Sequence, residues 1–106
     1  MEYRIVFDCP DKEKLIDKLL DAATKAGGGI VGNYSRCAII TRGYGTWKSG
    51  KGAHPNIGKV GKVSNVSSVK VEMPCARGKI KAVCKALRKA HPYEEPTIYI
   101  MKVNSG

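Results

Sequence analysis

The segment with the most chemical potential packs an imidazole, a phenol and two carboxylates into six residues: His91-Pro92-Tyr93-Glu94-Glu95-Pro96. Histidine and carboxylate groups together suit zinc, manganese or iron, or a general acid–base pair. Each proline fixes its own φ near about −65° and disfavours helix at the residue before it, so the polar groups are held on a stiff elbow. The segment is therefore a ligand or metal site, a catalytic site or a structural elbow.

In the structural interpretation, the carboxylates accept backbone or lysine hydrogen bonds and His91 caps the negative end of the preceding helix. His91 and Glu94 are three residues apart, but Pro92 interrupts the helix, so the spacing does not identify a metal. The sequence contains no Ser-His-Asp or Cys-His arrangement. We therefore predict no catalytic residue, and a protein that is not an enzyme is favoured.

A second group of candidates lies in the segment 43–61, which is rich in glycine and lysine and too long for a hairpin turn. Segments of this kind are usually functional or assembly elements. It contains the only tryptophan and the second histidine. The predicted ligands for a divalent metal ion are His91, Glu94, Glu95 and His54. Further contacts to a ligand or to a neighbouring subunit are predicted for Tyr93, Trp47, Lys48 and Lys51.

Two glycine patterns resemble nucleotide sites but do not have the required context. Gly27-x-Gly29-x-x-Gly32 follows a helical pattern and precedes a strand, the reverse of the dinucleotide fingerprint. These glycines predict a helix end and a tight turn. Gly45-x-x-x-x-Gly50-Lys51 lacks the serine or threonine that holds magnesium in a phosphate-binding loop. Neither pattern predicts a bound nucleotide.

The elements that position these residues follow from hydrophobic periodicity. Residues 3–8 alternate as in a strand, and a helix is expected to open at Cys9-Pro10-Asp11 and to end at Gly27. A shift of 64 residues repeats this plan, because Pro74 takes the place of Pro10 and a second apolar stripe runs over 80–90. The remaining strands are predicted at 34–42, continuing through 46–48, then at 63–71, 69–73 and 97–103.

Two β-α-β halves of this kind describe an α+β ferredoxin-like sandwich of order βαββαβ, with two helices on one face of an antiparallel sheet. The length of 106 residues predicts a single domain, residues 1–106. No apolar run approaches the roughly 20 residues that span a bilayer, so no membrane partner is expected. The sequence begins directly in a strand pattern without a signal peptide, which predicts a cytoplasmic protein. Its four scattered cysteines are expected to be buried, reduced side chains.

The net charge of +10 is unevenly distributed. No Asp or Glu occurs between Asp21 and Glu72, and the second helical pattern carries six cations and no acid. Such a balance attracts polyanions by counterion release, so nucleic acid is an alternative partner. A solvated basic face that keeps the protein soluble explains the same charge.

Four motifs in order resemble a known family: Gly32-Asn33-Tyr34-Ser35-x-Cys37, Gly43-x-Gly45-Thr46-Trp47, Gly52-Ala53-x-Pro55-x-Ile57-Gly58 and the elbow at 91–96. The chain is similar to the YqfO-type domain, which occurs inside hexameric dinuclear-metal proteins called GTP cyclohydrolase-like and also as small stand-alone proteins. The resemblance covers about residues 3–103. It implies a fold similar to CutA and to the PII signalling proteins, and assembly as a homotrimer.

The resemblance does not assign the metal ligands or the activity of the long family members to this chain. In the long members, the two metals are bound by segments that flank this domain and that are missing here. The third motif commonly has asparagine where this chain has His54. The expected function is a non-enzymatic trimeric module that binds a metal ion or small ligand at clefts between subunits. One alternative is a nucleic-acid or polyanion-binding protein, and a second is a purely structural assembly module.

Overall fold

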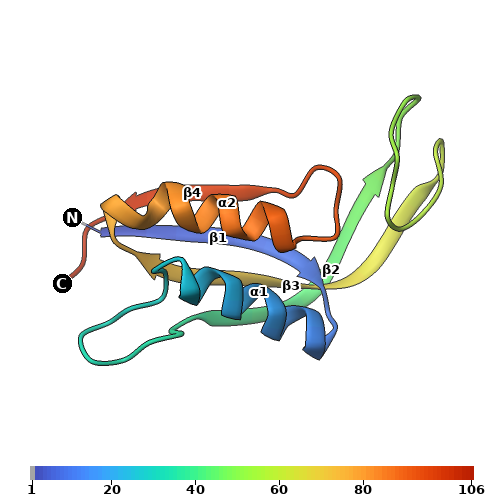
Figure 1. Cartoon of the computed structure of the whole chain (residues 1–106). Helices are drawn as coiled ribbons and strands as arrows, with labels where there is room; N and C mark the ends of the chain where they lie inside the picture. The colour runs from blue at the N-terminus through green and yellow to red at the C-terminus, as the bar shows by residue number, and fades with distance from the viewer. Residues whose placement is uncertain (1) are drawn as a thin grey trace.

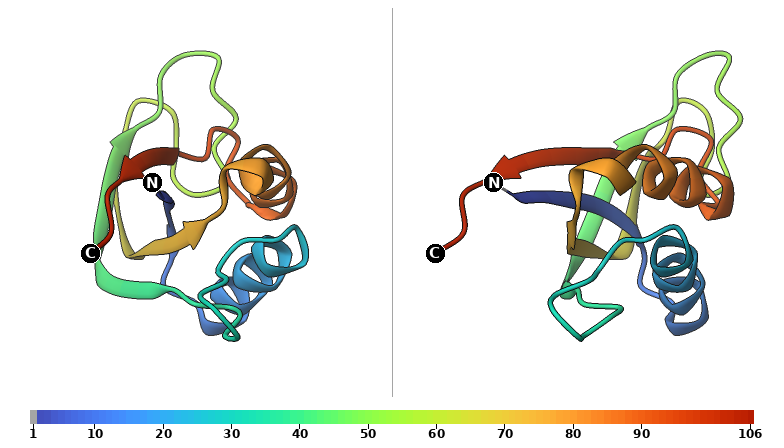
Figure 2. Two further views of the ribbon diagram at one scale, coloured as in Figure 1. Left: turned by 90° about the vertical axis from the view of Figure 1, so that its left-hand side faces the viewer. Right: turned by 60° about the vertical axis from the view of Figure 1, so that its left-hand side comes forward.

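The computed structural model describes residues 2–106, so Met1, where the predicted domain begins, lies outside the described residues. A four-stranded antiparallel sheet has the order β2-β3-β1-β4. Both helices, α1 and α2, cover the same face of the sheet (Figure 1 and Figure 2). This is the predicted ferredoxin-like α+β sandwich. None of the helices within residues 2–106 is long and apolar enough to cross a bilayer.

The strands and helices follow the predicted order βαββαβ. In chain order they are β1 (Glu2–Pro10), α1 (Glu13–Lys25), β2 (Ile39–Lys48), β3 (Val63–Cys75), a 3-10 turn η1 (Arg77–Lys79), α2 (Ile80–Ala90) and β4 (Ile98–Val103). The segments predicted at 63–71 and 69–73 are one continuous strand, β3.

The core lies between the sheet and the two helices. Alternate residues of the central strands point into it, and the largest fully buried side chains are Phe7, Ile5, Leu19, Met73 and Leu87. Each helix presents one apolar stripe to this layer, as the 3.6-residue periodicity predicts. The hydrophobic effect of burying these stripes holds the helices against the sheet.

The start of α1 differs from the prediction. Pro10 is the last residue of β1, where it pairs with Ser68, and α1 begins only at Glu13. A proline is tolerated at a strand end because no ladder hydrogen bond is required from it there. The main-chain N–H of Asp11 then donates to the carbonyl of Ser67, which turns the chain out of the sheet. Pro74 likewise lies within β3, so the repeat pairs two strand-end prolines rather than two helix openings.

The start of β2 also lies later than predicted, at Ile39 instead of residue 34. Val31 and Tyr34 exchange two main-chain hydrogen bonds and form a tight local turn. Arg36 then has a φ of 58°, outside the extended region, and its guanidinium is paired with Asp17 and Asp21 of α1 at 3.0 and 3.1 Å. A strand cannot continue through a residue in this left-handed conformation.

β2 and β3 extend well beyond the rest of the sheet and form an arm, visible in Figure 1 as a bent two-stranded projection. Their pairing continues to Lys48 and Val63, so the loop expected at 43–61 is shorter and runs over 49–62. The base of this loop is closed by the N–H of Gly61, which donates to the carbonyl of Ser49 at 2.7 Å.

The glycines that resemble a dinucleotide fingerprint form the exit of α1, as predicted. The N–H of Gly29 donates to the carbonyl of Pro74 at 2.8 Å, and its φ is 73°. A Cβ atom at this position would lie 3.1 Å from both main-chain N and O of Cys37. The glycine therefore allows a close approach of two backbones rather than of a phosphate.

We predict that Gly29→Ala lowers the free energy of unfolding by about 1–3 kcal/mol, because a left-handed conformation and a backbone contact both resist a side chain. Gly43→Ala is the matched control, since its φ is not positive and nothing lies within 4 Å of the added Cβ. Urea unfolding monitored by circular dichroism measures both variants. Equal stability of the two would contradict this role for Gly29.

Candidate functional site

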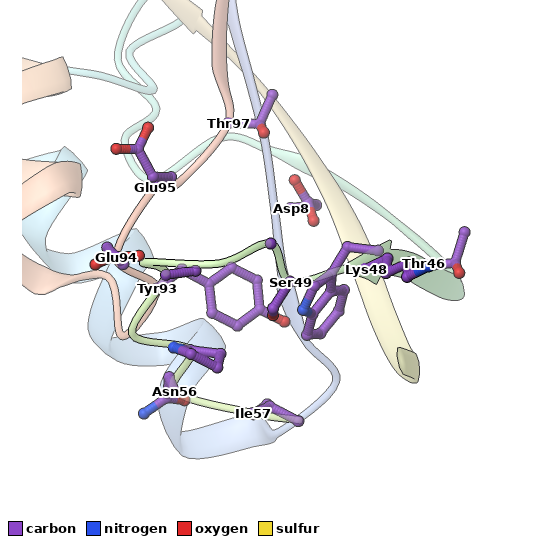
Figure 3. A pocket seen from close by; sticks show the side chains of 15 residues that line it. Asp8, Thr46, Lys48, Ser49, Asn56, Ile57, Tyr93, Glu94, Glu95 and Thr97 are labelled. Carbon is purple, nitrogen blue, oxygen red and sulfur yellow. The ribbon is translucent and has the colours of Figure 1, made fainter. Parts of the chain in front are cut away.

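The elbow and the arm meet at one end of the sheet and enclose a cleft of about 370 Å³. Its walls come from the end of β2, the loop 49–57, the elbow residues 93–95, and Asp8 and Thr97 (Figure 3). Segments distant in the sequence therefore converge at one site. Of the predicted site residues, those that line the cleft are Trp47, Lys48, Tyr93, Glu94 and Glu95.

His91 is not in the cleft wall but lies behind it, with 7% of its surface exposed. α2 ends at Ala90, and His91 is the capping residue in an extended conformation, as expected before a proline. Its Nδ1 accepts a hydrogen bond from the N–H of Tyr93 at 3.1 Å. Its Nε2 lies 2.7 Å from the main-chain carbonyl of Asp8 and therefore carries the proton that it donates there.

Both ring nitrogens of His91 are thus engaged with the main chain. In this arrangement neither nitrogen has a free lone pair for a metal ion, contrary to the metal-ligand role predicted for His91. Within residues 2–106, no group of three or more His, Cys, Asp or Glu side chains is placed to hold a metal ion. The imidazole instead joins the elbow to β1.

His54 and Lys51 are both exposed on the loop and lie outside the cleft wall. The loop is nevertheless attached to the elbow, because the main-chain N–H of His54 donates to Oε1 of Glu94 at 3.1 Å. This bond lies within one chain. The Glu94 carboxylate thereby joins the elbow to the loop, and the His54 side chain is exposed.

Two aromatic rings pack against each other in the cleft wall. The ring centroids of Trp47 and Tyr93 are 5.5 Å apart with an interplanar angle of 57°, a favourable tilted geometry. Tyr93 also packs on the His91 ring at 4.9 Å. The Tyr93 ring is thereby fixed between the arm and the imidazole.

The hydroxyl of Tyr93 is buried and has no hydrogen-bond partner among the described residues. Burial raises the pKa of this phenol above its usual value, and the negative charge of Asp8 raises it further. An unpaired buried hydroxyl is costly, so a bound molecule that reached this group and hydrogen-bonded to it would be stabilising.

Asp8 is the principal cleft residue that sequence reasoning missed. It lies near the end of β1, on the face of the sheet without helices, and pairs with Lys70 across the ladder. In the sequence it is only one polar position of an alternating strand. One feature of the sequence could have indicated it, because an acidic residue at the end of a central strand lies close to any segment that crosses that end of the sheet.

The cysteines show no activated thiol. Cys9 and Cys75 are buried as predicted, and burial raises the pKa of Cys9 to about 11. Cys84 is half-buried in α2, and burial raises its pKa as well. Cys37 lies in the turn before β2 rather than in a strand. All four thiols are free.

The fold and the cleft define an α+β domain of CutA-like architecture. The CutA1 protein of Thermus thermophilus, a divalent cation tolerance protein, superposes with a TM-score of 0.70 at 14% identity, over 100% of this chain and 87% of that one. A Bacillus cereus protein related to NIF3 superposes with a TM-score of 0.82 at 27% identity, over 98% of this chain and 26% of that one.

Sequence comparison gives the family. The chain is 38% identical over 94 residues to a GTP cyclohydrolase 1 type 2 homolog of Halalkalibacterium halodurans, which covers 89% of this chain and 25% of the relative. No protein-family profile matches the chain. The chain belongs to the YqfO-type domain of these NIF3-related proteins, as the four motifs indicated. It spans about a quarter of the length of the relatives it matches.

We predict that His91→Ala lowers the free energy of unfolding by roughly 2–4 kcal/mol, because it removes two hydrogen bonds and a buried ring contact. His54→Ala is the matched control at the only other histidine, and its exposed side chain predicts a change within about 0.5 kcal/mol. Thermal and urea unfolding measure both. A His91→Ala protein as stable as His54→Ala would show that the imidazole does not hold the elbow.

Proposed function

We propose that this chain is a non-enzymatic binding module that assembles as a homotrimer and holds a metal ion or small ligand in the cleft between arm and elbow. The observation that carries the proposal is Tyr93, which lines the cleft and whose buried hydroxyl has no hydrogen-bond partner among residues 2–106. A ligand that hydrogen-bonds to it would offset the cost of burying an unpaired polar group.

The charges of the cleft favour a cationic ligand. Asp8, Glu94 and Glu95 line it together with one cation, Lys48, so three of the nine acidic residues of a chain with net charge +10 lie at one site and leave it with an excess of negative charge. The two rings of Trp47 and Tyr93 add faces that attract cations. The structural similarity to a divalent cation tolerance protein supports the same class of ligand.

A metal ion in this cleft would need ligands from a second subunit, because one chain supplies no group of three suitable side chains within residues 2–106. One chain would contribute carboxylate oxygens from at most two of Asp8, Glu94 and Glu95, and the exposed His54 of a neighbouring loop would contribute a ring nitrogen. Carboxylate and imidazole together suit manganese or zinc. His91 remains a structural residue in this proposal.

The sheet face without helices supports the trimer. Its outward positions include exposed apolar residues: Ile39 is 60% exposed, Tyr99 63% and Met101 50%. The ladder places Tyr99 opposite Val6 and Met101 opposite Arg4, so these side chains share one face. An apolar sheet face of this kind is typical of a surface that is buried on association.

We predict that the purified protein is a trimer by multi-angle light scattering and that Tyr99→Glu shifts it to monomers, because a carboxylate on a buried interface is left unpaired. Tyr34→Glu is the control, since this tyrosine is 75% exposed, against 63% for Tyr99, but lies in the turn before β2. A monomeric wild-type protein, or a trimeric Tyr99→Glu protein, contradicts the assembly through this face.

We predict that protein purified without a histidine tag binds Mn²⁺ or Zn²⁺ in titration calorimetry, and that Asp8→Asn weakens the binding by roughly tenfold through the loss of one carboxylate. Tyr93→Phe should weaken binding of any small ligand that uses the hydroxyl, while leaving the unliganded protein as stable or up to about 1 kcal/mol more stable. Glu13→Gln, an exposed acid at the start of α1, is the charge-matched control.

The two predictions fail independently. An Asp8→Asn protein with wild-type affinity for the metal excludes the cleft as its site even if the trimer is intact. A less stable Tyr93→Phe protein shows that the hydroxyl already has a partner in the free protein.

A further inference from the structure

The surface of α2, together with the 3-10 turn before it, is strongly basic. Residues 77–89 contain no acid and expose six cations: Arg77, Lys79, Lys81, Lys85, Arg88 and Lys89. Four of the six line a groove of about 690 Å³ beside α2: Arg77, Lys81, Lys85 and Arg88. The other exposed residues of the segment 76–90 are small: Ala76, Gly78 and Ala82.

The six cations are not neutralised within the fold. The ion pairs found among residues 2–106 involve only Arg36 and Arg42 as cations, so none of the six has an acidic partner there. The neighbouring helix α1 contains three acids, but two of them, Asp17 and Asp21, are paired with Arg36. The positive charge of α2 is therefore available to a partner.

The cations form a regular row. Arg77, Lys81, Lys85 and Lys89 recur every four residues, so successive charges are about 6 Å apart and the row is about 18 Å long. Like charges one turn apart destabilise a helix. The first turn of α2 also has no acid, although the helix dipole adds partial positive charge at this end. An anionic partner along the row would relieve this repulsion.

Association of the subunits does not cover this row. α2 lies on the helix-bearing side of the sheet (Figure 2), whereas Tyr99 and Met101 of the proposed trimer contact lie on the opposite face. The row consists of helix side chains, and no main-chain group of β4 takes part in it. A trimer assembled through the helix-free face would present three such rows on its outer surface.

We propose that the basic face of α2 binds the phosphate backbone of duplex nucleic acid without reading its sequence. A duplex carries one negative charge per about 1.7 Å, so a row about 18 Å long faces about ten phosphates. Segment 76–90 has no aromatic side chain, and Tyr3 in the groove is half-buried. Single strands are usually held by base stacking on aromatic rings, so a duplex is favoured.

Two other partners fit this face less well. Interfaces with proteins depend on buried aromatic or other large anchor residues, and the exposed positions of 76–90 offer only cations and small residues. A helix that lies on a membrane inserts large apolar side chains into it, and these exposed positions provide none. Phosphate contacts require only the cations.

The test uses fluorescent duplexes of about 20 base pairs, one of DNA and one of RNA with the same sequence. We expect the full chain to bind in anisotropy titrations, with an affinity that falls linearly in a log–log plot against salt. Lys81→Gln/Lys85→Gln should weaken binding by roughly tenfold or more at about 0.1 M salt and lower the steepness of that plot by about 2. Glutamine has nearly the helix propensity of lysine, so α2 stays folded.

The matched control is Lys59→Gln/Lys62→Gln, which removes the same charge from exposed positions of the loop 49–62 and should leave the affinity unchanged. Binding of either duplex that depends on Lys81 and Lys85 supports the proposal, and the tighter duplex identifies the polymer. Equal affinity of the two double variants overturns it. So does tighter binding of a single strand of the same length, or a strong preference for one duplex sequence.

Three further results identify a different occupant and also overturn the proposal. Polyglutamate that binds more tightly through the same two lysines would indicate an acidic protein. Phosphatidylserine vesicles that do so would indicate a membrane surface. A change in the oligomeric state of Lys81→Gln/Lys85→Gln by light scattering would make this face a contact between copies of the chain.

Discussion

Both helices lie against the same face of the sheet, and this one-sided covering determines where each functional surface lies. The covered face forms the core and is closed to ligands. The other face exposes Ile39, Tyr99 and Met101, which is why we propose association there. After α2, the chain turns around the end of the sheet to reach β4. This turn, the elbow, meets the arm of β2 and β3, and the cleft lies between them.

Much of this arrangement could be predicted, because the two halves repeat the same local physics. Apolar residues at helical spacing specify both helices, the glycines at 27–29 end the first, and His91-Pro92 ends the second. The predicted element boundaries were wrong where the backbone conformation, and not the hydrophobic pattern, determines where an element begins or ends. Pro10 looks like a helix start but ends a strand, and Arg36 delays the start of β2 to Ile39 with a positive φ that no periodicity reveals.

The cleft was predictable only in part, for a related reason. The elbow and Trp47 are conspicuous in the sequence, and the structure brings Tyr93 and Trp47 into contact. The role of His91 was not predictable, since a histidine beside carboxylates reads the same whether its nitrogens face a metal or the main chain. Only the placement of the Asp8 carbonyl, 83 positions away in the chain, decides between them.

The distribution of charge differs between two surfaces of the molecule. Asp8, Glu94 and Glu95 gather at the cleft, whereas the groove beside α2 collects Arg77, Lys81, Lys85 and Arg88 with no acid in the helix. At physiological salt, charges more than about 8 Å apart across solvent are largely screened from one another. Each surface therefore attracts or repels charged ligands according to its own local charge rather than the net charge of +10.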